Sequence, residues 1–122
     1  MIFTVNDGGG LSIVEILKNA GRDEIIMATI DGDPKSIDNI KNSKLTVIDT
    51  AQFCGPIGAE AIKIAYDVLL GKNVAEHILI PTFPVTKETL ELYPGWAGPI
   101  PESFEKPWKA NETMWDNSIK EK

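Results

Sequence analysis

The stretch Ile25-Ile26-Met27-Ala28-Thr29-Ile30-Asp31-Gly32 decides the fold of this chain. Five of its first six residues are apolar, and the run then stops at an aspartate and a glycine. An uninterrupted apolar run is typical of a strand that is buried on both faces of a parallel sheet. Asp31 would then stand at the carboxyl end of the strand, the edge where ligands bind in open α/β folds. Its carboxylate could cap a helix, form a turn or bind a ligand.

Strands and helices alternate on both sides of this run. Further strands are predicted at 2–5, 45–51 and 78–80. Helices are predicted from about residue 13 to 20, from 34 to 42 and from 55 to 70. The order β-α-β-α-β-α-β predicts an α/β fold with a parallel sheet and right-handed crossovers.

The start of the first helix stays open between residues 8 and 13. Asp7 could cap the helix at the glycine run, and Ser12 with Glu15 forms a competing capping box. The run Gly8-Gly9-Gly10 lies where a phosphate cradle would be expected. It lacks the spacing of a dinucleotide fingerprint and the ending of a P-loop, so phosphate binding is disfavoured.

Charge and composition exclude several classes of function. The net charge of −6 leaves no basic stripe for nucleic acid. Cys54 and His77 are each the single residue of their kind, which leaves no internal disulfide, no thiol or histidine metal cluster and no cysteine–histidine or serine–histidine nucleophile. We therefore expect neither a metal nor a cofactor, and we expect that the protein is not an enzyme.

The character of the chain changes after about residue 85. Four prolines interrupt any regular element, and three tryptophans follow one another at Trp96, Trp108 and Trp115. Disordered tails are poor in aromatic residues, so we expect an irregular tail that packs on the body through its rings. A short helical turn is predicted at 113–119. The tryptophans are expected to be packing anchors rather than ligand platforms.

Planar polar side chains stand at three predicted strand ends: Asn6, Asp31 and Gln52. Carboxylates and amides of this kind suit sugars, because each can serve two neighbouring hydroxyls at once. Each residue also has a plain structural interpretation. Asn6 could cap a helix, Asp31 with Gly32 could form a turn, and Gln52 could simply be exposed.

Several short motifs, in their order and spacing, resemble the C-terminal part of the ribose-binding-protein-like family, the type I periplasmic sugar-binding proteins of ABC transporters. The resemblance covers residues 2 to about 85. The motifs are Val5-Asn6-Asp7, Asn19-Ala20-Gly21, Ala28-Thr29-Ile30-Asp31-Gly32, Lys44-Leu45, Thr50-Ala51-Gln52 and Ile57-Gly58-Ala59. In that family the matching asparagine, aspartate and glutamine bind the sugar. The resemblance therefore implies that Asn6, Asp31 and Gln52 are ligand-binding residues.

The family's fold implies that this chain supplies only parts of two α/β lobes. Residues 1–48 would be the C-terminal part of one lobe, 49–52 a hinge crossover, 53–84 part of the other lobe, and 85–122 the tail. Such lobes would leave open sheet edges, which invite pairing. We expect a C-terminal fragment or split chain, completed by an N-terminal portion of the same protein or by a swapped copy. The signal peptide would lie in that missing portion.

The function implied is capture of a sugar between two lobes, outside the cytoplasm in the periplasm or at the cell surface, and its delivery to an ABC-transporter permease. The alternative is the effector-binding core of a sugar-responsive transcriptional repressor, which shares the fold. Those cores usually read Gly-Phe-Asp-Asp where this chain reads Thr29-Ile30-Asp31-Gly32. A third possibility is an enzyme with Asp31 or Asp7 as general base, but no partner residues accompany either carboxylate.

Overall fold

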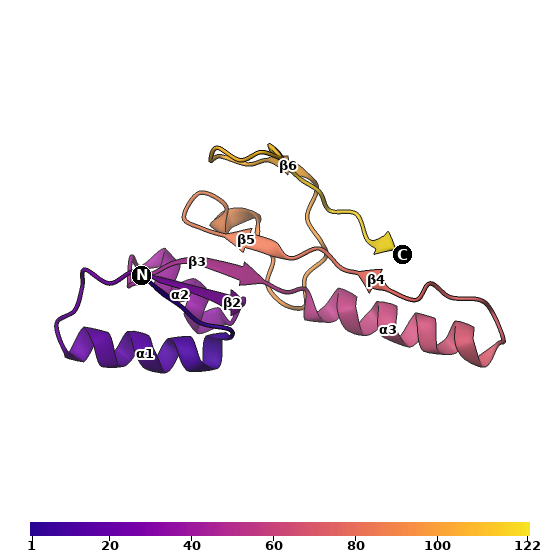
Figure 1. Cartoon of the computed structure of the whole chain (residues 1–122), viewed down its shortest axis with the longest axis horizontal. Helices are drawn as coiled ribbons and strands as arrows, with labels where there is room; N and C mark the ends of the chain where they lie inside the picture. The colour runs from indigo at the N-terminus through magenta and orange to yellow at the C-terminus, as the bar shows by residue number, and fades with distance from the viewer.

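The computed structural model describes all residues from 1 to 122 (Figure 1). The helices are α1 (Asp7–Asn19), α2 (Pro34–Lys41), α3 (Cys54–Leu69) and the short 3-10 helix η1 (Leu90–Leu92). The strands are β1 (Ile2–Phe3), β2 (Met27–Asp31), β3 (Thr46–Ala51), β4 (Ile78–Leu79), β5 (Phe83–Val85), β6 (Phe104–Glu105), β7 (Met114–Trp115) and β8 (Lys120–Glu121). None of the helices combines the length and the apolar character that crossing a membrane requires.

A four-stranded sheet in the order β1-β2-β3-β5 forms the centre of the molecule. The strands β1, β2 and β3 are parallel, and β5 runs antiparallel to β3. The apolar run that decides the fold becomes β2, and Asp31 at its end pairs with Ala51 of β3. The predicted α/β fold with a largely parallel sheet is therefore confirmed.

The fourth predicted strand does not extend this parallel sheet. Residues 78–79 form β4, which pairs antiparallel with β8 near the C-terminus in a separate two-stranded sheet. The strand that borders β3 is β5, which the sequence does not predict, because it is three residues long and contains Pro84. Proline lacks a donor for the sheet ladder, and it is tolerated here because β5 is an edge strand.

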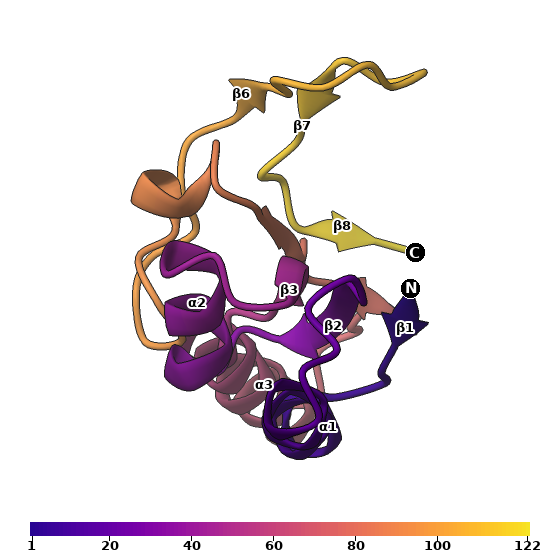
Figure 2. The same ribbon diagram turned by 90° about the vertical axis from the view of Figure 1, so that its left-hand side faces the viewer.

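Two apolar clusters hold the sheet between the helices and the tail. The smaller one joins Val14 of α1 to Met27 and Leu45. The larger one lies around β3 and β5 and contains Ile40, Ala51, Phe53, Phe83, Val85 and Trp115. In Figures 1 and 2, α1 lies on one side of the sheet, and the tail strands β6 and β7 lie on the other. The molecule thus has helix, sheet and tail layers.

The tail packs through its aromatic rings, but its end is extended rather than helical. The helical turn predicted at 113–119 is wrong, because Met114 and Trp115 form β7, which pairs with β6. The extended backbone lets the Trp115 indole pack against Phe83 with a ring separation of 5.2 Å and donate from Nε1 to the Thr82 carbonyl at 2.8 Å. A tertiary contact has therefore overridden the local helical preference.

Helix α3 projects away from the central sheet (Figure 1). None of its residues is buried. Its exposed apolar residues include Ile57, Ile62, Tyr66, Val68 and Leu69. The helix predicted from 55 to 70 is therefore confirmed, and the rest of the chain leaves most of its large apolar side chains exposed.

Candidate functional site

Asp31 and Gln52 meet at the carboxyl edge of the sheet. The strands β2 and β3 are parallel neighbours, so residues at their ends lie side by side. Gln52 Nε2 donates to Asp31 Oδ1 at 2.9 Å, and the Gln52 backbone N–H donates to the Asp31 carbonyl at 3.1 Å. The other oxygen, Asp31 Oδ2, accepts from the backbone N–H of Asp7 at 3.3 Å. Two of the three predicted site residues are thus in direct contact.

Asn6 lies next to this pair in the chain but serves α1. Its Oδ1 accepts a hydrogen bond from the Gly9 N–H at 2.9 Å, which makes Asn6 the N-cap. The alternatives that Asp7 or the Ser12–Glu15 box caps the helix are therefore wrong. Asn6 is exposed and makes no hydrogen bond to Asp31 or Gln52. Its Nδ2 group remains available as a donor.

The backbone of Asp31 adopts a conformation that normally belongs to glycine, with a φ of 130°. A non-glycine residue in such a region costs about 1–3 kcal/mol and persists only where its surroundings fix it. The contacts described above supply that constraint, since both carboxylate oxygens and the carbonyl oxygen of Asp31 accept hydrogen bonds. Strain held in this way is common at ligand sites.

Directly beneath the edge lie two buried carboxylates, Asp7 and Asp49. Asp7 accepts from the Thr29 hydroxyl at 2.6 Å and from the Asp33 N–H at 2.7 Å. Asp49 Oδ1 accepts from the Gly32 N–H at 3.0 Å. Each carboxylate therefore fixes one residue of the turn that follows Asp31. The turn is therefore held by the side chains of Asp7 and Asp49, which are not among the predicted ligand-binding residues.

Asp49 is fully buried, and its Oδ2 has no hydrogen-bond partner. Burial, with the negative charge of Asp7 as the next cause, raises the pKa of Asp49 to about 7. The protonated form would convert the orphan oxygen into a donor. The sequence carries a signal for this residue, because the charged Asp49 interrupts the predicted strand near its end, but nothing in the sequence pairs it with Asp7.

Tyr93 reaches the same edge from the tail. Its hydroxyl donates to the Gln52 carbonyl at 3.3 Å. Burial, together with the negative charge of Asp49, raises the pKa of Tyr93, so its hydroxyl keeps its proton at neutral pH. No sequence pattern connects residue 93 to this site, because 41 residues separate it from Gln52.

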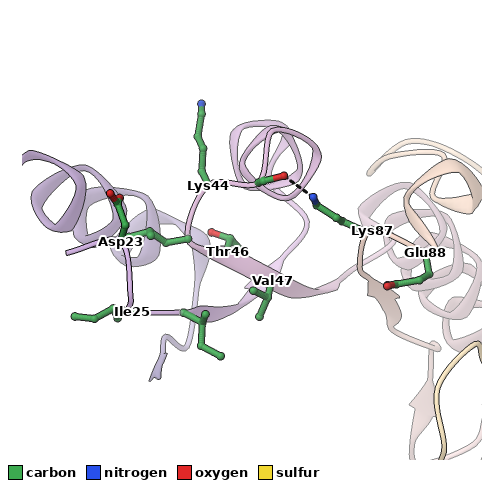
Figure 3. A pocket seen from close by; sticks show the side chains of 10 residues that line it. Asp23, Ile25, Lys44, Thr46, Val47, Lys87 and Glu88 are labelled. Carbon is green, nitrogen blue, oxygen red and sulfur yellow. Dashed lines mark hydrogen bonds between the residues drawn. The ribbon is translucent and has the colours of Figure 1, made fainter. Parts of the chain in front are cut away.

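A distinct hollow of about 360 Å³ lies near the amino ends of β2 and β3 (Figure 3). Asp23, Ile25, Lys44 and Thr46 are among its lining residues, and Lys87 Nζ donates a hydrogen bond to Ser43 Oγ across its wall. It therefore lies at the edge opposite Asp31. This hollow and three others on the surface are lined by no predicted site residue. Asn6 is exposed and Asp31 and Gln52 are half-buried, so the candidate site is an open edge of the sheet.

The site offers hydrogen-bond acceptors and donors in planar groups. Each carboxylate oxygen of Asp31 accepts one hydrogen bond within the chain and retains capacity for another. Gln52 Oε1 and Asn6 Nδ2 have no hydrogen-bond partner within the chain. Such a set can accept from and donate to neighbouring hydroxyls of one ligand.

No known family model matches the chain. A stretch of 73 residues, 60% of the chain, is 32% identical to the ribose import binding protein RbsB of Salmonella typhimurium, and the same figures hold for the protein of that name from Salmonella typhi. The match covers 24% of each relative, so the chain spans about a quarter of their length. The similarity is partial and of low identity, and it points to a relationship with periplasmic binding proteins.

Proposed function

We propose that the chain is part of a sugar-binding protein that captures its ligand by hydrogen bonds and performs no chemistry on it. The observation that carries this proposal is the contact of 2.9 Å between Gln52 Nε2 and Asp31 Oδ1 at the carboxyl edge of a parallel sheet. Asn6, Asp31 and Gln52 bind the sugar hydroxyls in this account. The partial similarity to ribose import binding proteins supports the same class of ligand.

The proposal extends to transport. The protein would act in the periplasm or at the cell surface and pass its sugar to an ABC-transporter permease. It would bind no nucleic acid, a role for which the net charge of −6 is unsuitable. The similarity to two ribose import binding proteins supports a role in import.

A complementary portion completes the site in this proposal. It would be an N-terminal portion of the same protein or a swapped copy of this chain. Two observations support it: the candidate site is an open edge, and helix α3 has no buried residue. Ligand pockets normally enclose most of their ligand, so an open edge needs a second wall.

The test is calorimetric titration of the complete protein with a pentose, a hexose and a disaccharide, with ribose as the pentose. We expect saturable binding of at least one sugar. The variant Asp31→Asn should lower the affinity about 100-fold, because hydrogen bonds from the ligand to the two oxygens each lose about 1.4 kcal/mol when the acceptor loses its charge. Absence of binding by every sugar would overturn the proposal.

The matched control is Asp38→Asn, which makes the same change on the exposed surface of α2, where Asp38 pairs with Lys44. It should bind sugar as the unmodified protein does. Equal losses in both variants would mean that the carboxylate of Asp31 has no special role.

A further inference from the structure

Two aromatic residues of the tail hold the backbones of both contacting site residues. Trp96 Nε1 donates to the Asp31 carbonyl at 2.7 Å, and Tyr93 Oη donates to the Gln52 carbonyl at 3.3 Å. The Asp31 carbonyl also accepts from the Gln52 N–H, so both of its lone pairs are used. We call residues 93–96 the strap.

The strap also contacts the segment that follows Gln52, at the start of α3. The Trp96 carbonyl accepts from the N–H of Gly55 at 2.9 Å, in the first turn of α3. A Cβ on Gly55 would lie 3.2 Å from Ala97, so the tail backbone rests directly on this turn. Trp96 therefore bonds to the end of β2 through its side chain and to the start of α3 through its backbone. Gln52 lies between these two elements in the sequence.

The strap is itself anchored in the core. The Tyr93 ring stacks on Phe83 at 5.6 Å and contacts Phe53 at 6.0 Å. A Cβ on Gly32 would come within 2.5 Å of Tyr93 Oη, so the hydroxyl touches the turn that follows Asp31. By contrast, the Trp96 side of the strap remains partly open, with 36% of that residue exposed.

We propose that the strap is a positioning element of the sugar site: it fixes the carbonyls of Asp31 and Gln52 and thereby holds their side chains in the geometry that binds sugar. The reason is the strained φ of Asp31, which survives only while its carbonyl and carboxylate are held. The inference rests on the proposed function for its ligand. The geometry itself is testable without any ligand.

The test replaces Trp96 by phenylalanine in the complete protein, which keeps an aromatic ring and removes the Nε1 donor. The side-chain amide resonances of Gln52 are recorded by ¹⁵N–¹H NMR, together with ribose affinity and melting temperature. We expect Trp96→Phe to shift or broaden these resonances and to lower ribose affinity about tenfold, the equivalent of one net hydrogen bond.

The matched control is Trp115→Phe, which removes an indole donor to a backbone carbonyl away from the site, at Thr82. It should lower the melting temperature and leave the Gln52 amide and the ribose affinity unchanged. Should Trp96→Phe fail to fold, Tyr93→Phe removes only the hydroxyl from the strap and should move the Gln52 amide in the same way.

Two outcomes would overturn the inference. One is an unchanged Gln52 amide in Trp96→Phe or, where that variant does not fold, in Tyr93→Phe. The other is an equal change in Trp115→Phe, which would make the effect one of general stability. If the unmodified protein binds no sugar, the proposed function fails, and the amide comparison alone still decides the role of the strap.

Discussion

Gly32 lies where the sheet edge, β3 and the tail meet. Its φ is +82°, and an added Cβ would lie 2.5 Å from Tyr93 Oη and 2.6 Å from Ala51 Cβ. Glycine is therefore required here for two separate reasons, backbone conformation and space. Gly21, after α1, shares only the first reason, because its φ is +66° and nothing lies within 4 Å of an added Cβ.

This difference gives a prediction for two matched variants. Gly21→Ala should cost about 1 kcal/mol from the left-handed backbone alone. Gly32→Ala should cost about 2 kcal/mol more, because overpacking adds to the same backbone term. Urea denaturation measures both free energies of unfolding. Equal losses would contradict the close approach of Tyr93 to the turn.

Asp49 gives a prediction about pH. Because its folded-state pKa is raised to about 7 from an ordinary value of 3.8, the folded chain holds a proton that the unfolded chain releases between these pH values. This group's contribution therefore makes stability fall as pH rises from about 4 to 7, and the penalty is complete above pH 7. Below pH 4 both states are protonated and the contribution disappears.

The variant Asp49→Asn tests this directly. Its amide carries no charge and keeps an oxygen for the Gly32 N–H. The fall in melting temperature between pH 5 and pH 8 should be smaller in Asp49→Asn than in the unmodified protein, with Asp38→Asn as the exposed control. An identical pH dependence in all three proteins would show that Asp49 is ionised at neutral pH.

At the scale of elements, the strands with strong local patterns could be predicted from the sequence. The apolar run that became β2 and the Asp33-Pro34 start of α2 are local signals, and Asp33 does cap α2 by accepting from the Lys35 N–H at 2.8 Å. The short strands β5, β7 and β8 could not be predicted. They have two or three residues each, too few to carry a local pattern, and each is defined by its pairing with another strand.

The same contrast applies to the candidate site. Asp31 and Gln52 were found because each follows a predictable strand, and parallel strands bring their ends together. The buried pair Asp7 and Asp49 and the strap residues were not found as a group. Their contacts span up to 65 residues of sequence and depend on the path of an irregular tail.

At the scale of the whole molecule, helix α3 is the exposed feature that needs a partner. Ile62 is 74% exposed and Leu69 is 84% exposed. A gathering of large apolar side chains on one element normally marks an interaction surface. We predict that the chain of 122 residues, expressed alone, is oligomeric or poorly folded. Light scattering and calorimetry check this, and a monodisperse monomer with a cooperative melting transition would contradict it.

A charge on α3 should distinguish assembly from general insolubility. Ile62→Glu places a carboxylate among the exposed apolar side chains of α3 and should shift the oligomer toward monomer, whereas Lys41→Glu, on the exposed end of α2, should not. Sedimentation at several concentrations measures the effect. An oligomer that Ile62→Glu leaves intact would show that α3 is not its interface.

The central claim is that sugar binds at the edge formed by Asp31 and Gln52. The most direct measurement is a ribose titration of the complete ¹⁵N-labelled protein, observed at the side-chain amide of Gln52. The account predicts a saturable shift of this amide, together with that of Asn6, and its loss in Asp31→Asn. Saturable binding that leaves both amides unmoved, or no binding at all, would contradict the account.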